Sequence, residues 1–276
     1  MKHVALACTL LTLAAALPSA AASYDGSAPF EAAAEVRRVK LGPAATKPIS
    51  YKEIRCFYFE GLTVKEIDER EIGDKQISYL IRASGQPRPP CTGDTVAGER
   101  NLPSTESYFW GVVANALFLI DADGANGSIG FSVYDRQSGR RRFQDTTKLG
   151  TKIRHASAEG DTLRLGYTRV ITGACSIIMN GDACWKSIAQ QIGISDVSPP
   201  DCRNGYEDAL HRLAAAACTA QSGNKPLCIK KEMQSRRSGW DASPSMVSYN
   251  VDVLLAPNDE AAIKPIGRPI SCWPSD

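Results

Sequence analysis

The sequence predicts an α+β fold, in which a mostly antiparallel β meander is followed by a disulfide-clamped helical hairpin and a late C-terminal strand. Three observations predict this order. Apolar and polar residues alternate in much of residues 51–171, with the period of two that is typical of half-buried strands. Residues 204–223 have apolar positions at helical spacing. Residues 245–257 then alternate again, so we expect one disulfide-stabilised α+β domain over residues 51–276, with a boundary near residue 171 as the alternative.

Residues 1–22 have the three parts of a secretory signal peptide. Lys2 provides the basic start, residues 4–17 form an uncharged apolar run, and Ala20 and Ala22 have the −3 and −1 positions of a cleavage site. The run is too short for a membrane-spanning helix, which needs about 20 residues. We therefore expect a periplasmic or secreted protein with no transmembrane anchor after cleavage.

The next segment, residues 23–50, mixes small residues, three prolines and charged residues. This composition predicts a flexible leader, with one short helix around Glu31 to Lys40.

Cleavage removes Cys8 and leaves an even number of cysteines. An even number in an exported chain predicts a disulfide framework. Eight cysteines allow 105 pairings, and the sequence alone does not choose among them. Proximity in the chain favours Cys56 with Cys91 and Cys175 with Cys184. For the four late cysteines the preferred split is Cys218 with Cys228 and Cys202 with Cys272. A zinc site is the alternative, but the chain has no C-x-x-C or H-x-x-x-H spacing to support it.

The clearest part of the meander consists of residues 108–121, 128–135 and 140–146, which are three β-prone segments. Two separators rich in Gly, Asn, Asp or Ser lie between them, and these residue types accept the positive φ angles of hairpin turns. Upstream, residues 85–107 form a long loop rich in Pro, Gly and Ser, with Cys91 near its middle. Long loops in compact domains are often functional, but we favour a structural loop that a disulfide holds in place.

The helical hairpin is expected from two segments that follow the meander. The helix in residues 204–223 ends at Gly223, and a second helix restarts with Pro226 in its first turn. A Cys218–Cys228 bridge would clamp the two helices near their connection.

The segment "DADGANG", residues 121–127, resembles the start of a calcium-binding loop. Asp121 and Asp123 match the first and third positions, but Ala125 and Asn126 replace an oxygen ligand and the required Gly, and the Glu of the twelfth position is missing. We therefore favour a hairpin turn. A weaker calcium site formed by Asp121, Asp123 and Asn126 is the alternative.

Composition argues against two classes of partner. Lys and Arg number 32 against 30 Asp and Glu, for a formal net charge of +2, whereas nucleic-acid and membrane-surface binders collect an excess of positive charge. Short basic runs such as Arg140-Arg141-Arg142 are interpreted as solvated faces.

No motif identifies a catalytic residue. His155 and His211 are interpreted as isolated surface histidines, and G-x-S-x-G and the Gly-rich phosphate loops are absent from the sequence. Paired carboxylates meet only in space, so the sequence leaves a carboxylate-based site open.

The leading hypothesis is a secreted or periplasmic, non-catalytic binding or accessory protein for an envelope component or another exported protein. Two alternatives stay open. One is an exported hydrolase with a carboxylate-based site, and the other is a calcium-stabilised structural or adhesion module.

Overall fold

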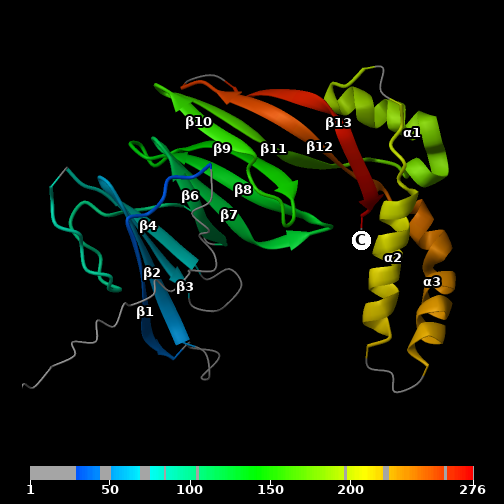
Figure 1. The fold of residues 1–276 in the computed structure, drawn as a ribbon, viewed down its shortest axis with the longest axis horizontal. Coiled ribbons are helices and arrows are strands. Elements are labelled where there is room, and N and C mark those ends of the chain that lie inside the picture. The colour runs from blue at the N-terminus through cyan, green and yellow to red at the C-terminus, as the bar shows by residue number, and fades with distance from the viewer. Residues whose placement is uncertain are drawn as a thin grey trace, which may run out of the picture.

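The computed structural model describes residues 29–43, 51–68, 75–83, 85–103, 106–195, 198–219, 224–257 and 260–275. The expected signal peptide lies outside the described residues. Within them the chain forms two antiparallel β-sheets and three helices (Figure 1). The α+β fold with a β meander, a later helical region and a C-terminal strand is therefore confirmed.

The smaller sheet has five strands in the order β1-β2-β3-β4-β5. These strands are β1 (Glu35–Pro43), β2 (Tyr51–Phe59), β3 (Leu62–Asp68), β4 (Lys75–Ile81) and β5 (Arg100–Asn101). The turn between β2 and β3 contains Gly61, whose φ of 66° lies in the left-handed region that glycine adopts without a steric penalty.

Strand β1 corrects the prediction of a short helix around Glu31 to Lys40. This segment is extended and pairs with β2 from Glu35 opposite Tyr58 to Pro43 opposite Tyr51. Just before it, the ring of Phe30 lies 5.1 Å from that of Phe118 in the larger sheet. The prediction of a helix was wrong because the composition of the segment does not reveal these distant partners. The folded part of the chain therefore begins before residue 51.

The larger sheet has the order β13-β12-β11-β9-β8-β7-β6, and β10 also pairs with β11. Its strands are β6 (Ser107–Val113), β7 (Ala116–Ala125), β8 (Ser128–Asp135), β9 (Arg141–Lys148), β10 (His155–Glu159), β11 (Thr162–Thr172), β12 (Ser245–Leu255) and β13 (Ala262–Pro274). Residues 108–121, expected as one strand, are divided between β6 and β7. Ala114, with a φ of 49°, makes this reversal without the Gly or Pro that would have marked it in the sequence.

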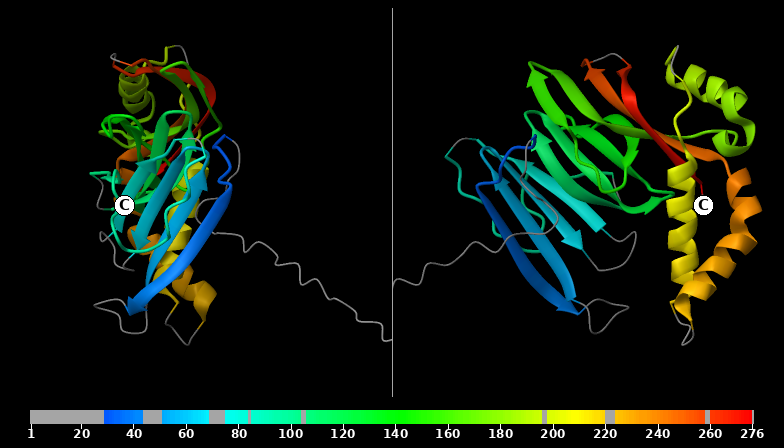
Figure 2. Two further views of the ribbon diagram at one scale, coloured as in Figure 1. Left: turned by 90° about the vertical axis from the view of Figure 1, so that its left-hand side faces the viewer. Right: turned by 45° about the vertical axis from the view of Figure 1, so that its right-hand side comes forward.

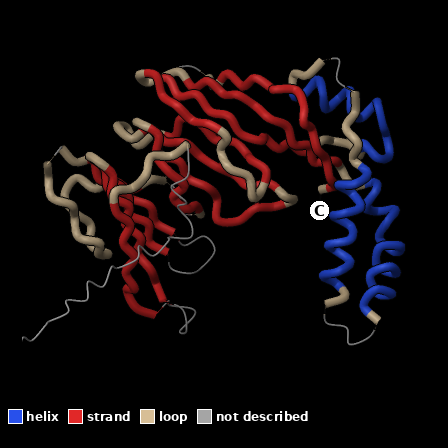
Figure 3. The backbone as a smooth tube through the Cα atoms, in the orientation of Figure 1, coloured by secondary structure: helices blue, strands red, loops and turns tan. Residues whose placement is uncertain are grey.

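The three helices lie between β11 and β12 and at one end of the larger sheet (Figures 1 and 3). They are α1 (Ile177–Ile192), α2 (Arg203–Ala217) and α3 (Lys225–Ala242). The side chains of Ser176 and Asn224 cap α1 and α3 by accepting hydrogen bonds from free backbone N–H groups of the first turn. The α2–α3 hairpin extends away from the sheets, as Figure 2 shows. Within the described residues no helix is both long and apolar enough to cross a membrane.

The two sheets pack through a shared aromatic and aliphatic core. Phe57, Val64 and Tyr79 of the smaller sheet are buried with Phe109 and Leu117 of the larger one. The rings of Phe57 and Phe109 are 4.8 Å apart, a distance at which tilted aromatic pairs attract each other. The opposite face of the larger sheet forms a second core with α1 and α2.

All four disulfides join the pairs expected from the sequence. They are Cys56–Cys91, Cys175–Cys184, Cys202–Cys272 and Cys218–Cys228. Four disulfides fit a protein of an oxidising compartment.

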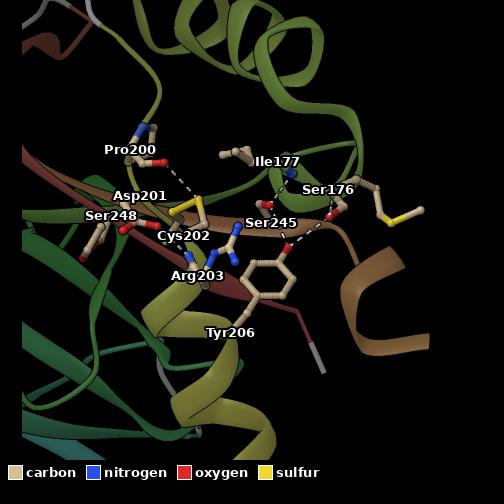
Figure 4. Close-up of a disulfide and its surroundings, with 12 residues drawn as sticks. Ser176, Ile177, Pro200, Asp201, Cys202, Arg203, Tyr206, Ser245 and Ser248 are labelled. Carbon is tan, nitrogen blue, oxygen red and sulfur yellow. Dashed lines mark hydrogen bonds between the residues drawn. A yellow bond between two sulfur atoms is a disulfide. The ribbon is translucent and has the colours of Figure 1, made fainter. Parts of the chain in front are cut away.

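The base of the α2–α3 hairpin is held by the Cys202–Cys272 bridge and by a buried hydroxyl network (Figure 4). The Tyr206 hydroxyl lies 2.8 Å from Ser245 Oγ and donates to the Ser243 carbonyl at 3.0 Å. Ser245 Oγ accepts in turn from the N–H of Ile177 at 2.8 Å. Residues from α1, α2 and β12 therefore meet at one point, and each buried polar group there has a partner.

The loop of residues 85–103 covers the outer face of the smaller sheet. Cys91 ties it to β2, and Lys65 Nζ donates to the Asp94 carbonyl at 2.7 Å and to Glu99 Oε2 at 2.9 Å. Burial alone would raise the pKa of Glu99, but hydrogen bonds from Lys65, Ser78 and Val96 outweigh it and leave the pKa below its ordinary value. These contacts support the structural interpretation of this loop.

We expect loss of the Cys202–Cys272 bridge to destabilise the protein more than loss of the Cys218–Cys228 bridge. The first closes a 70-residue separation and the second only 10 residues, which correspond to about 4 and about 3 kcal/mol of lost chain entropy. Denaturant unfolding of C202A/C272A and of C218A/C228A measures the difference. Equal losses would contradict it.

We expect Glu99 to add acid sensitivity to the stability of the protein. A carboxyl group with a lowered folded-state pKa contributes stability above its unfolded pKa and loses it as the pH falls through the folded value. Glu99→Gln should lower the free energy of unfolding by about 2 kcal/mol at about pH 7, and by much less at low pH. The exposed Glu60→Gln is the matched control. A pH-independent difference between the two variants would contradict the expectation.

Candidate functional site

A polar groove lies at the end of the larger sheet that is remote from the helices. Four connections meet there: the β6–β7 turn, the β8–β9 turn, the β10–β11 turn and the start of the β12–β13 connection. The groove has a volume of about 620 Å³. Its lining residues are Asn115, Asp135, Gln137, Ser138, Arg140, Arg141, Arg142, Asp161, Leu255, Ala256 and Pro257.

The β8–β9 turn is shaped by one carboxylate. Asp135 Oδ1 accepts from the backbone N–H and the hydroxyl of Ser138, both at 2.7 Å, an arrangement by which an Asp side chain closes a turn on itself. Gly139 follows with a φ of 72°. The chain can thus reverse within a few residues and place consecutive arginines at the rim of the groove.

Burial disfavours the charged form of Asp135, but the two Ser138 hydrogen bonds and the nearby Arg142 outweigh it and lower its pKa. Asp135 is therefore a fixed anion whose oxygen is already used within the turn.

Arg142 joins three of the connections. Its Nη2 donates to the Asp161 carbonyl at 2.9 Å and to the Leu255 carbonyl at 3.0 Å. The guanidinium group thus binds the β10–β11 turn and the end of β12 to β9, and Arg142, Asp161 and Leu255 all line the groove.

Arg140 and Arg141 are exposed, and within the described residues no ion pair uses their guanidinium groups. Arg136, at the start of the same turn, has a buried Nε without a hydrogen-bond partner in the described part of the chain. The groove itself is lined by three arginines, Arg140 to Arg142, and by two carboxylates, Asp135 and Asp161. It therefore carries more positive charge than its own carboxylates neutralise, which makes it suited to an anionic ligand.

The sequence predicted that Arg140-Arg141-Arg142 form a solvated face. The exposure of the first two residues agrees with this prediction, but the groove that they line was not predicted. The triplet beside a turn was the only signal, because Asp161 and Leu255 approach it only in the folded chain.

Of the three candidate calcium ligands, Asp121 and Asn126 do not line this groove. The reversal between β7 and β8 lies at Asn126 and Gly127, with φ of 53° and 73°, so the predicted turn is present. The carbonyl of Asn126 accepts from Trp273 Nε1 at 2.7 Å, and the turn thereby docks on β13. The side chain of Asp123 lies outside the described residues.

The side chain of Asp121 lies against the neighbouring strands β6 and β8. Its Oδ1 accepts from Ser107 Oγ at 3.3 Å, and its other oxygen occupies the space where a side chain at Gly130 would begin. Burial raises the pKa of Asp121, and the charge of Glu106 adds to that effect, while the Ser107 hydrogen bond opposes it. Among the described residues no group of three or more His, Cys, Asp or Glu side chains is arranged to hold a metal. Calcium binding stays a prediction.

Neither His155 nor His211 lines the groove. His155 Nε2 lies 3.4 Å from Asp252 Oδ1, which Arg154 also contacts. His211 is exposed on α2.

A second polar cluster is present on the core face of the larger sheet. Asp145 Oδ2 lies 2.8 Å from Arg169 Nε and also accepts from the Tyr167 hydroxyl. Burial, together with the charge of Asp145, raises the pKa of Tyr167 far above its ordinary value. The three groups satisfy one another, so we interpret this cluster as structural.

Comparisons with known proteins yielded no match to this chain among family models, curated proteins or solved structures.

We expect Arg142 to matter for stability and its neighbour Arg141 to matter little. Arg142→Gln removes two charge-assisted hydrogen bonds to backbone carbonyls and should lower the free energy of unfolding by about 2 kcal/mol. Arg141→Gln, an exposed control in the same strand, should change it by less than about 0.5 kcal/mol. Denaturant unfolding of both variants measures the two changes in stability. Similar stabilities would show that the hydrogen bonds of Arg142 do not stabilise this end of the sheet.

Proposed function

We propose that the protein is a periplasmic or secreted, non-catalytic binding or accessory protein whose groove holds an anionic component of the cell envelope. The observation that carries this proposal is the pair of exposed guanidinium groups, Arg140 and Arg141, at a groove formed by four connections. The planar guanidinium group donates two parallel hydrogen bonds to a carboxylate or a phosphate.

The rest of the lining favours an acidic saccharide over a small inorganic anion. Asn115 and Gln137 add side-chain amide groups to the groove, and such groups can bind sugar hydroxyls. The volume of about 620 Å³ falls within the range of about 300–1,000 Å³ that is common for ligand sites. A short acidic saccharide would use both the charge and the polar lining.

The distribution of charge supports a local site. The net charge of the whole chain is only +2, so general attraction to polyanions is weak. The arginines of one turn supply the attraction at one place. The secretory signal predicted from the sequence and the four disulfides both support an exported protein, which would meet envelope polymers.

An exported hydrolase is the second candidate, and one observation favours it. Asp121 is a half-buried carboxyl group with a raised pKa, the property that a general acid needs. Incubation with a polyuronate followed by sizing of the polymer separates the two candidates. Chain shortening that Asp121→Asn abolishes would establish the hydrolase and overturn the non-catalytic proposal.

We expect the double variant R140S/R141S to lose binding to polygalacturonate by about tenfold or more, since two charge-assisted contacts disappear. K230S/K231S removes the same charge from α3 and is the matched control, which should bind like the unmodified protein. Calorimetric titration of oxidised protein measures both, with neutral dextran as the uncharged ligand. The proposal fails if dextran binds equally well or if the two double variants behave alike.

A further inference from the structure

The α2–α3 hairpin, at the end of the protein opposite the groove, has a helix with little contact to the rest of the chain. None of the residues of α3 is buried. α2 packs against β13, whereas α3 contacts mainly α2. Figures 1 and 2 show both helices extending away from the two sheets.

Several contacts hold this exposed hairpin in one geometry. Cys218–Cys228 joins the helices near their connection, and Cys202–Cys272 fixes α2 to β13. Glu207 Oε2 accepts from Arg237 Nη2 at 2.8 Å. Isolated helices of this length are only marginally stable in water, so these links keep an otherwise weakly supported surface in place.

Internal contacts use two acids of the hairpin, while Asp208 and several cations stay exposed. Glu207 pairs with Arg237, which lowers the pKa of Glu207, and Glu232 pairs with Arg236 at 2.9 Å. The exposed Lys225, Lys230, Lys231 and Arg212 have no ion pair within the described residues. The surface of the hairpin is therefore positively charged.

These cations are close in the chain to two exposed leucines. Arg212 and Leu213 are in the last two turns of α2, and Lys225, Leu227, Lys230 and Lys231 are in the first two turns of α3. Because the helices form an antiparallel hairpin, both segments lie toward its outer end. Leu227 is 50% exposed and Leu213 is 37% exposed. We call these six residues the tip patch.

We propose that the tip patch is a docking surface for an acidic protein partner. The charge of the patch is complementary to a surface rich in Asp and Glu, and its two leucines can enter an apolar contact inside a polar rim, the usual anatomy of a protein interface. A membrane surface fits less well, since a membrane-binding helix needs a continuous apolar face. The inference goes beyond the groove and does not depend on it.

A synthetic helical peptide with a Glu-rich face and central Leu residues provides the test, and its Gln-substituted version is the uncharged control. We expect the acidic peptide to bind the full, oxidised protein, and K230E/K231E to weaken that binding by about tenfold or more. R140S/R141S, altered only at the groove, should bind the peptide like the unmodified protein. Circular dichroism shows whether charge reversal in K230E/K231E impairs folding. If it does, K230Q/K231Q, which removes the charges without reversing them, takes its place.

A charge-swapped peptide, with Lys in place of Glu, makes the test reciprocal. It should bind K230E/K231E better than the unmodified protein. The proposal is overturned if the acidic peptide does not bind, if the Gln peptide binds as tightly, or if phosphatidylglycerol vesicles bind the tip patch more tightly than the acidic peptide. Polygalacturonate binding at the groove is measured separately, so failure of either site is distinguishable from failure of the other.

Discussion

The Cys202–Cys272 bridge is the constraint on which the relation between the helices and the sheets depends. It links the start of α2 to the end of β13, and so encloses the helical hairpin and strand β12. Gly205 lies so close to the Cys272 carbonyl that a Cβ there would be 1.9 Å from the oxygen. The Tyr206 hydroxyl then reaches Ser245. This close approach makes an exposed helical hairpin a fixed part of the fold, although α3 buries no residue of its own.

The end of β13 also makes hydrogen bonds to other parts of the larger sheet. Trp273, next to the bridged cysteine, donates to the Asn126 carbonyl of the β7–β8 turn, and the Ser275 N–H donates to the Pro244 carbonyl. Helices, hairpin turn and C-terminal strand therefore share one junction. At the opposite end of the sheet no disulfide joins the described residues, and there Arg142 joins the connections through backbone carbonyls. The groove thus lies at one end of the larger sheet, and the hairpin that carries the tip patch extends away from the other end (Figure 1).

Only part of the candidate groove could be predicted from the sequence. The Arg140-Arg141-Arg142 triplet and the turn before it were visible in the sequence, and a turn was the correct interpretation there. The meeting of that turn with Asp161 and Leu255 was not visible, because these residues are far apart in the chain and approach only when β9, β11 and β12 pair.

The sequence by itself determined the α+β class, with a β meander followed by a helical hairpin and a late strand, and its preferred cysteine pairs are the ones that form. Periodicity is a local property, and the cysteines of two bridges lie only 9 and 10 residues apart in the chain. The tertiary structure alone decided that β1 is a strand and that α3 stays exposed. The backbone of β1 is satisfied by β2 and its core contacts are made with a distant part of the fold, so no property of its own residues could replace those partners.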